Sequence, residues 1–165
     1  MNVIERHLEF GGSHNEPNRI VVHAMGENIR DDKVYNAVEW LAKLELSAHA
    51  LVTPSGDVIR CRNDDEGAWH AKSFNTNSLG IEFLVQGIHD YGSFIERIKT
   101  PWVTPAQYQA GLEQIKDWIH KFSIERIDRH SDVSPGRKVD PGAGFPWQQL
   151  LSEIFDDQYT GVLDG

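Results

Sequence analysis

The sequence contains little of several features that define whole classes of protein. It has one cysteine, Cys61, among 165 residues, so an internal disulfide is excluded and stability must come from packing or from a metal. Its apolar runs are short, and none approaches the ~20 residues that a membrane-spanning helix needs. Internal repeats, low-complexity segments and an interdomain linker are also missing. We therefore expect one soluble globular domain over residues 1–165.

Basic residues are also scarce. The chain has 25 Asp and Glu against 16 Lys and Arg, which gives a formal net charge of −9. Because nucleic-acid binding depends on neutralising phosphates, we expect no nucleic-acid partner, and we expect no membrane partner either. Residues 1–10 include Glu5 and His7 where a signal peptide has its apolar core, so we expect the protein to be cytoplasmic at synthesis. We also expect it to be a monomer.

The spacing of apolar residues predicts alternating strands and helices. Strands are expected at 19–23, 78–85 and 126–129, and a hairpin at 48–53 and 58–62. Helices are expected at 34–44, at 105–122 and at 146–155, with Thr104 and Pro105 as the cap and first residue of the second helix. The Pro/Gly-rich segment 131–144 is expected to be a loop. This order predicts the α/β class, with a mixed central β-sheet flanked by helices in a single domain.

The expected strand 78–85 has two different faces. Leu79, Ile81, Phe83 and Val85 share one face, and Ser78, Gly80, Glu82 and Leu84 share the other. The small neighbours of Glu82 leave open surface beside its carboxylate, where water and a substrate could lie. Taken alone, a strand glutamate is more often a solvated side chain than a catalytic group.

Two histidines and one aspartate stand out by their positions. A lone histidine at a strand end, such as His23, is more often structural than a ligand. The segment 129–142, however, contains His130 and Asp140 on either side of a Pro-Gly turn, which can bring both side chains toward one point. Two imidazoles and a carboxylate are donors that a catalytic zinc ion takes, with a fourth position left for water.

Three motifs in order carry a more specific signal: RIVVHA at 19–24, AWHAKSFNTNSLGIEF at 68–83 and RHSDVSPGRKVDPG at 129–142. Together they resemble the type 2 N-acetylmuramoyl-L-alanine amidase family. This family includes cytosolic anhydro-muropeptide amidases, phage lysozyme-type amidases and peptidoglycan recognition proteins. The resemblance covers about residues 19–147, and three separated motifs are far more specific than one.

The resemblance implies that His23, His130 and Asp140 bind Zn²⁺. Some members of the family have a cysteine in the third position, and Asp140 makes this chain more similar to the anhydro-muropeptide branch. Cys61 is then not needed as a ligand and is expected to be a small packed residue.

The resemblance also assigns the catalytic residues and the substrate wall. Glu82 matches the catalytic glutamate, and Lys138 matches the group that stabilises the developing oxyanion. The residues implied in substrate binding, or in the layer directly behind the site, are Trp69, His70, Asn77 and His49. Read without the family, Trp69 and His70 could equally be structural.

The implied function is hydrolysis of the amide between the lactyl group of N-acetylmuramic acid and L-alanine, in peptidoglycan or in soluble muropeptides. One alternative is a non-catalytic peptidoglycan-binding module, although such proteins generally lack one metal ligand. Another is a regulatory interaction protein that uses the fold as a scaffold. The motifs leave open a recycling enzyme or a phage endolysin. Segments 6–17 and 86–103 match nothing in the family, and segment 86–103, with Tyr91, Phe94 and Trp102, could shape the substrate groove.

Overall fold

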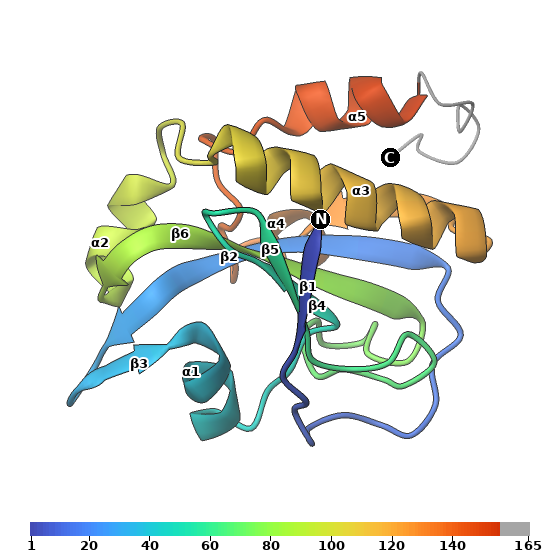
Figure 1. Cartoon of the computed structure of the whole chain (residues 1–165), viewed down its shortest axis with the longest axis horizontal. Helices are drawn as coiled ribbons and strands as arrows, with labels where there is room; N and C mark the ends of the chain where they lie inside the picture. Colours follow the sequence, from blue (N-terminus) through green and yellow to red (C-terminus); the bar gives the residue numbers. More distant parts are fainter. Residues whose placement is uncertain (156–165) are drawn as a thin grey trace.

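The computed structural model describes residues 1–155, which form a seven-stranded mixed sheet with helices on both faces (Figure 1). The strands follow the order β1-β5-β4-β6-β2-β3, and β7 pairs with β2. Their bounds are β1 Asn2–Glu5, β2 Arg19–Arg30, β3 Val34–Asn36, β4 Ala50–Val52, β5 Asp57–Arg60, β6 Ser78–His89 and β7 Arg126–Arg129. The predicted fold class, a mixed sheet flanked by helices, is confirmed.

Two long parallel strands, β2 and β6, form the centre of the sheet. Their register places His23 directly opposite Glu82. Strand β7 runs parallel to the first part of β2 and pairs Arg129 with Val22, while β3 pairs antiparallel with its last part. Both central strands continue beyond the predicted ends, β2 to Arg30 and β6 to His89.

The helices bury two separate apolar cores. Helices α3 (Pro105–Lys121) and α5 (Trp147–Phe155) lie on one face of the sheet, and α1 (Ala37–Lys43) lies on the other (Figure 1). The larger core takes the predicted apolar face of β6, Leu79, Ile81, Phe83 and Val85, which confirms that alternation. The smaller core beside α1 includes Leu84 and Cys61. Burial raises the pKa of the Cys61 thiol to about 12, so this residue is a packed apolar group as expected.

Helix α3 follows its sequence signals closely. The Thr104 side chain accepts a hydrogen bond from the backbone N–H of Gln107, and Pro105 is the first helical residue. Gly111 lets the helix approach the sheet, because a Cβ atom there would lie 2.3 Å from Cζ of Phe83. The residues expected to face inward, Leu112, Ile115, Trp118 and Ile119, are all buried.

Two further predicted boundaries, one of a helix and one of a loop, were wrong. The helix expected from residue 34 begins only at Ala37, because Asn36 and Glu39 form a capping box there and residues 34–36 pair with β2. The loop expected at 131–144 begins with a short helix, α4 (His130–Val133). The carboxylate of Asp132 accepts a hydrogen bond from the backbone N–H of Arg129 and so stabilises this turn.

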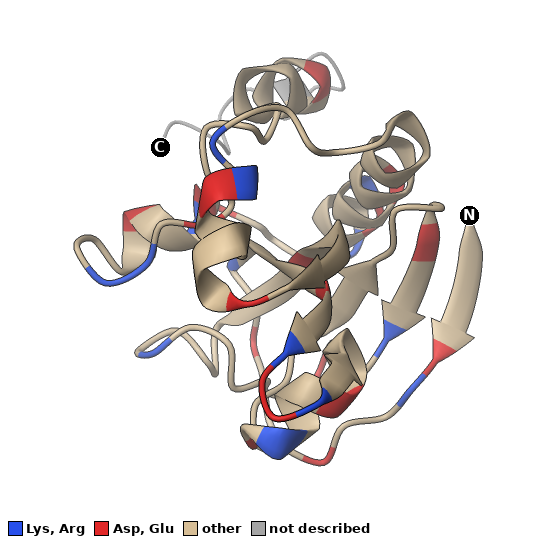
Figure 2. Cartoon of the chain, turned by 90° about the vertical axis from the view of Figure 1, so that its left-hand side faces the viewer, with Lys and Arg blue, Asp and Glu red and all other residues tan. Residues whose placement is uncertain are grey.

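The segment 86–103, which the sequence left unassigned, forms the end of β6 and helix α2 (Tyr91–Arg97). Asp90 caps α2 by accepting a hydrogen bond from the backbone N–H of Ser93. No helix within residues 1–155 is both long and apolar enough to cross a bilayer. Acidic and basic residues are interspersed over the elements that face the viewer in Figure 2.

Candidate metal centre and catalytic cavity

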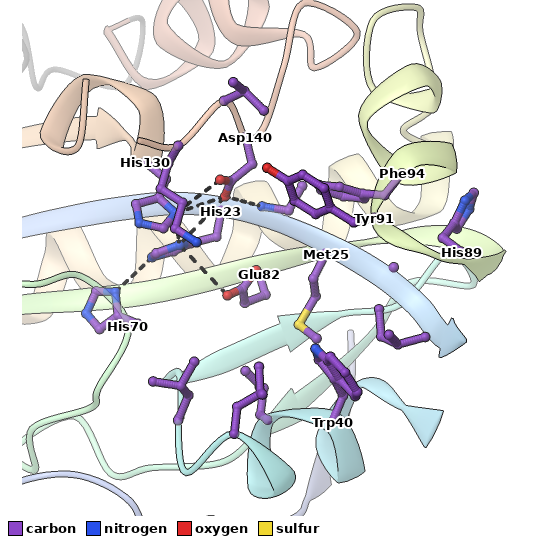
Figure 3. A pocket seen from close by; sticks show the side chains of 18 of the residues that line it. His23, Met25, Trp40, His70, Glu82, His89, Tyr91, Phe94, His130 and Asp140 are labelled. Carbon is purple, nitrogen blue, oxygen red and sulfur yellow. Dashed lines mark hydrogen bonds and ion pairs between the residues drawn. The ribbon is translucent and has the colours of Figure 1, made fainter. Parts of the chain in front are cut away.

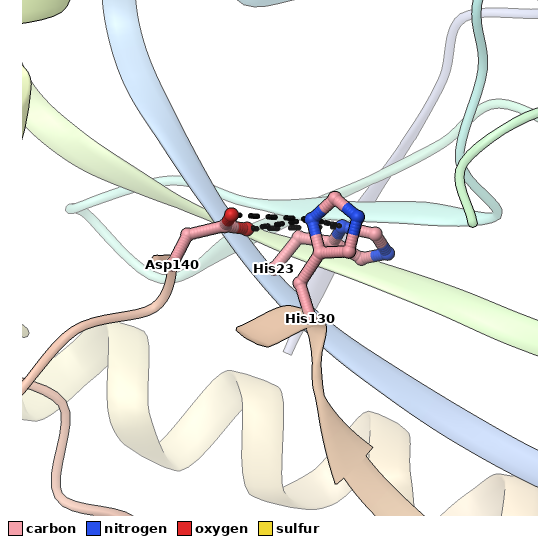
Figure 4. A group of neighbouring side chains, drawn as sticks. All are labelled: His23, His130 and Asp140. Atoms are coloured by element: carbon pink, nitrogen blue, oxygen red, sulfur yellow. Dashed lines mark hydrogen bonds and ion pairs between the residues drawn. The ribbon is translucent and has the colours of Figure 1, made fainter. Parts of the chain in front are cut away.

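Three buried side chains converge at the centre of the sheet: His23 from β2, His130 from the start of α4, and Asp140 (Figure 4). Nδ1 of His23 lies 3.0 Å from Nδ1 of His130. Nδ1 of His130 lies 3.1 Å from both carboxylate oxygens of Asp140, and Nδ1 of His23 lies 3.8 Å from Oδ2. The structure thus brings together the three ligands expected from the sequence.

The sheet itself produces this arrangement. Val22 and Arg129 are paired on the parallel strands β2 and β7, so the residues that follow them, His23 and His130, come to lie side by side. Asp140 is held in place by hydrogen bonds to both its side chain and its backbone carbonyl. Its Oδ2 accepts a hydrogen bond from the backbone N–H of Ala24 at 3.1 Å, and its carbonyl accepts one from the backbone N–H of Ser131 at 3.0 Å.

The donor set fits a zinc-type ion. Ligands at 2.0–2.1 Å from a tetrahedral Zn²⁺ lie about 3.3 Å apart, and the three donor separations here are 3.0, 3.1 and 3.8 Å. An imidazole must be neutral to bind a metal. Burial, followed by the charges of His130, His70 and Lys138, holds the pKa of His23 well below its usual range, which keeps this ring neutral.

Glu82 faces the group from the neighbouring strand, with Oε2 at 3.8 Å from Nδ1 of His23 (Figure 3). Its Oε1 is buried and has no hydrogen-bond partner among the described residues. Burial raises the pKa of this carboxyl well above its usual range, and the negative charge of Asp140 raises it further, whereas Lys138 lowers it. A carboxyl of this kind in a cavity is suited to accept and return a proton.

Lys138 belongs to the same site. It lies in the segment between His130 and Asp140, and its backbone N–H donates a hydrogen bond to the carbonyl of Ser134 at 3.0 Å. Its side chain lines the cavity, and its positive charge lowers the pKa of both His23 and Glu82. An ammonium group in this position can stabilise negative charge that develops beside His23, His130 and Asp140, which we call the metal group.

The cavity has a volume of about 620 Å³, which is enough for a small-molecule substrate. The metal group lies on one side of the cavity. Apolar side chains line the rest of the cavity in two directions from the metal group (Figure 3). Helix α1 contributes Trp40 and Leu41, and helix α2 contributes Tyr91 and Phe94. The sequence left open how segment 86–103 could shape the groove, and its aromatic residues Tyr91 and Phe94, both on α2, line the cavity.

Trp69 and His70 both line the cavity. The Trp69 side chain is 45% exposed, which leaves it free to contact a substrate. The ring nitrogens of His70, in contrast, are both engaged within the protein. Nδ1 lies 2.8 Å from Nε2 of His23, and Nε2 lies 2.8 Å from Oγ of Ser78. Hydrogen bonding of His70 to a sugar or peptide would require one of these bonds to break.

The other two residues, which were expected in the substrate wall or in the layer directly behind it, lie outside the cavity lining. His49 is fully buried, and its ring bonds to the carbonyl of Glu66 and the backbone N–H of Gly80, so it lies in the layer behind His70 instead of in the wall. Asn77 does not line the cavity either. Asn75 does, although the sequence reasoning missed it, and its Oδ1 accepts from the backbone N–H groups of His70 and Ala71.

A buried His-His-Asp group, a carboxyl with a raised pKa and a lysine in one cavity have the composition of a metal-dependent hydrolase centre. The comparison with known families specifies this class further. The family model described as N-acetylmuramoyl-L-alanine amidase matches residues 13–143, and the chain belongs to this family of hydrolases.

Individual relatives agree with this assignment. The 1,6-anhydro-N-acetylmuramyl-L-alanine amidase AmpD of Haemophilus influenzae is 32% identical over 130 residues, which is 75% of this chain and 67% of the relative. The chain thus spans about two thirds of that relative's length. The fold is shared with the N-acetylmuramoyl-L-alanine amidase LysC from Clostridium intestinale, with a TM-score of 0.71 and 19% identity over 94% of this chain and 98% of LysC.

A third similar protein has been solved with a bound ligand. The amidase AmiD from Escherichia coli, in complex with the substrate anhydro-N-acetylmuramic acid-L-Ala-D-gamma-Glu-L-Lys, has a TM-score of 0.63 and 27% identity. The match covers 90% of this chain and 61% of AmiD.

Proposed function

We propose that this protein is a zinc-dependent N-acetylmuramoyl-L-alanine amidase that cuts the amide between the lactyl group and L-alanine of soluble muropeptides. The observation that carries the proposal is the group of His23, His130 and Asp140 with Glu82 facing it in one cavity. The names of the relatives support the substrate class, because AmpD is named as a 1,6-anhydro-N-acetylmuramyl-L-alanine amidase and AmiD was solved with an anhydro-muramyl peptide.

In this proposal the residues have distinct roles. Zinc held by His23, His130 and Asp140 would acidify a water molecule and polarise the lactyl carbonyl. Glu82 takes the proton of the attacking water and passes it to the nitrogen of the leaving L-alanine. Lys138 stabilises the negative charge that develops on the carbonyl oxygen.

The environment of Glu82 supports its role as the group that carries the proton. Its burial and the nearby Asp140 raise the pKa of its carboxyl, so the protonated form is accessible between the two transfers. The unpartnered Oε1 leaves one oxygen of the carboxyl available to the reacting groups. A solvated surface glutamate would have neither property.

The net charge of −9 and the cavity of about 620 Å³ favour a small soluble substrate over an intact anionic wall. This preference supports an enzyme that recycles wall fragments in the cytoplasm. An endolysin, by contrast, would act on intact sacculi.

The test is a cleavage assay on zinc-loaded protein, with an anhydro-muramyl tripeptide and intact sacculi as parallel substrates. We expect release of the peptide from the soluble substrate, and faster turnover than on sacculi. Glu82→Gln is the matched control, since it keeps the shape of the side chain and loses the base. We expect it to retain zinc and to lose about 10²- to 10⁴-fold in kcat.

Other outcomes identify the alternatives. A zinc-loaded wild type that binds the muropeptide without cleaving it would be a peptidoglycan-binding module. Faster turnover on sacculi would identify an endolysin. Normal kcat in Glu82→Gln would remove Glu82 from the mechanism.

A further inference from the structure

A chain of hydrogen-bonding groups leads from His23 away from the metal group. Nε2 of His23 lies 2.8 Å from Nδ1 of His70, and Nε2 of His70 lies 2.8 Å from Oγ of Ser78. The Ser78 hydroxyl in turn bonds to the carbonyl oxygen of Phe74 at 2.5 Å. The chain therefore ends on a group that can only accept a hydrogen bond.

The direction of every bond follows from that end. The carbonyl of Phe74 has no hydrogen, so the Ser78 hydroxyl donates its single hydrogen to it. Oγ of Ser78 can then only accept, and the hydrogen between Ser78 and His70 belongs to Nε2 of His70. A neutral imidazole has one N–H, which leaves Nδ1 of His70 as an acceptor for the Nε2–H of His23.

The same rule, that a neutral imidazole has one N–H, also determines the tautomer of His23. With its hydrogen on Nε2, a neutral His23 presents a bare Nδ1 toward His130 and Asp140, where the metal group lies. We propose that His70 is a positioning residue that fixes the tautomer of His23 for metal binding, and not a group that binds substrate. This inference rests on the metal centre of the proposed function.

The packing around His70 is consistent with this role. A Cβ atom on residue 80 would lie 2.5 Å from Nδ1 of His70, so Gly80 is the residue that allows the ring to reach its place. His49 contacts the ring edge to face, with 5.9 Å between centroids, and Asn75 holds the backbone of His70. Nε2 of His130 is buried without a partner among the described residues. The hydrogen bonds through His70 and Ser78 therefore orient His23 and not His130.

The experiment compares two substitutions at one position. His70→Asn keeps an acceptor close to the place of Nδ1, whereas His70→Leu removes it. Zinc dissociation constants are measured by competition with a chromophoric chelator at one fixed pH. The tautomer of His23 is read in the metal-free protein from nitrogen-15 chemical shifts. His14→Leu, at an exposed residue that does not line the cavity, is the control for a histidine-to-leucine change.

We expect His70→Leu to weaken zinc binding by about 10- to 100-fold, as loss of the hydrogen-bond partner of a ligating histidine typically does. The His23 signals should then show both tautomers, while His70→Asn restores a single Nε2–H form and most of the affinity. Circular dichroism of each variant verifies its fold, and the Asn variant keeps the test valid if the Leu variant unfolds.

Several results would overturn the inference. Wild-type zinc affinity and an unchanged His23 tautomer in His70→Leu would show that His70 does not position His23. A raised KM for the muropeptide with unchanged zinc affinity would make His70 a substrate-binding residue. A wild type that binds no zinc would refute this inference and the proposed function together, whereas a zinc-loaded wild type that cleaves no muropeptide would refute only the proposed function.

Discussion

Removal of the metal is expected to loosen one segment of the protein while the rest stays folded. Residues 131–139 connect two of the proposed zinc ligands, His130 and Asp140. Within this segment only Ser134 is buried, and residues 135–137 and 139 are exposed. Its backbone hydrogen bonds run from residues 131, 134, 137 and 138 to the carbonyls of residues 140, 130 and 134, so they all stay within residues 130–140. Because apolar burial contributes little here, the two ligands are the main attachment of this segment.

The size of the effect follows from linkage. A ligand that binds only the native state stabilises it by RT ln(1 + [L]/Kd), which is about 2.7 kcal/mol at a free zinc concentration of ~100 Kd. In a chain of this length each kcal/mol shifts Tm by about 2–4 °C, so we expect the metal-free protein to melt about 5–10 °C lower. The apolar cores beneath α3 and beside α1 do not depend on the ligands, so the fold should persist.

The assay is thermal unfolding with and without a chelator, paired with amide hydrogen exchange over residues 131–139. We expect exchange to accelerate in this segment and to change little in β2 and β6. Identical melting curves and unchanged protection of the segment would refute the reasoning, because the segment would then be held by packing.

Two substitutions test other parts of the structure. Lys138→Ala should lower kcat by about 10²- to 10³-fold with little change in KM or fold, since it removes only stabilisation of developing charge. Steady-state kinetics measure the rate and circular dichroism verifies the fold. An unchanged rate would show that Lys138 has no part in catalysis. Gly111→Ala should destabilise the protein by about 1–3 kcal/mol, because its Cβ would lie 2.3 Å from Cζ of Phe83; urea denaturation measures this, and an unchanged midpoint would mean that the Phe83 ring can move aside.

Much of the fold could be predicted because its signals are local. The alternation of β6 and the cap of α3 depend on residues that are neighbours in sequence, and both were predicted correctly. The approach of His23 to His130 and Asp140 was expected from three motifs in order, and the structure brings these side chains together.

The remaining features depend on contacts between distant residues. Val34 continued an apolar helical spacing, and only its pairing with β2 makes it part of a strand. The burial of His49 and the bond of His70 to His23, 47 residues away, are properties of the folded sheet and not of the residue types. For the same reason the sequence could not say how segment 86–103 shapes the cavity.

The register of β2 and β6 places His23 opposite Glu82. The site and the apolar core therefore both depend on the same pairing of these two strands. A slip of either strand by one residue would turn its core side chains outward and point His23 or Glu82 into the apolar layer. A chain that pairs these strands in the wrong register therefore exposes apolar side chains and also fails to form the site. Quality control that removes misfolded chains would then remove inactive ones too, and the surviving population would be uniformly competent.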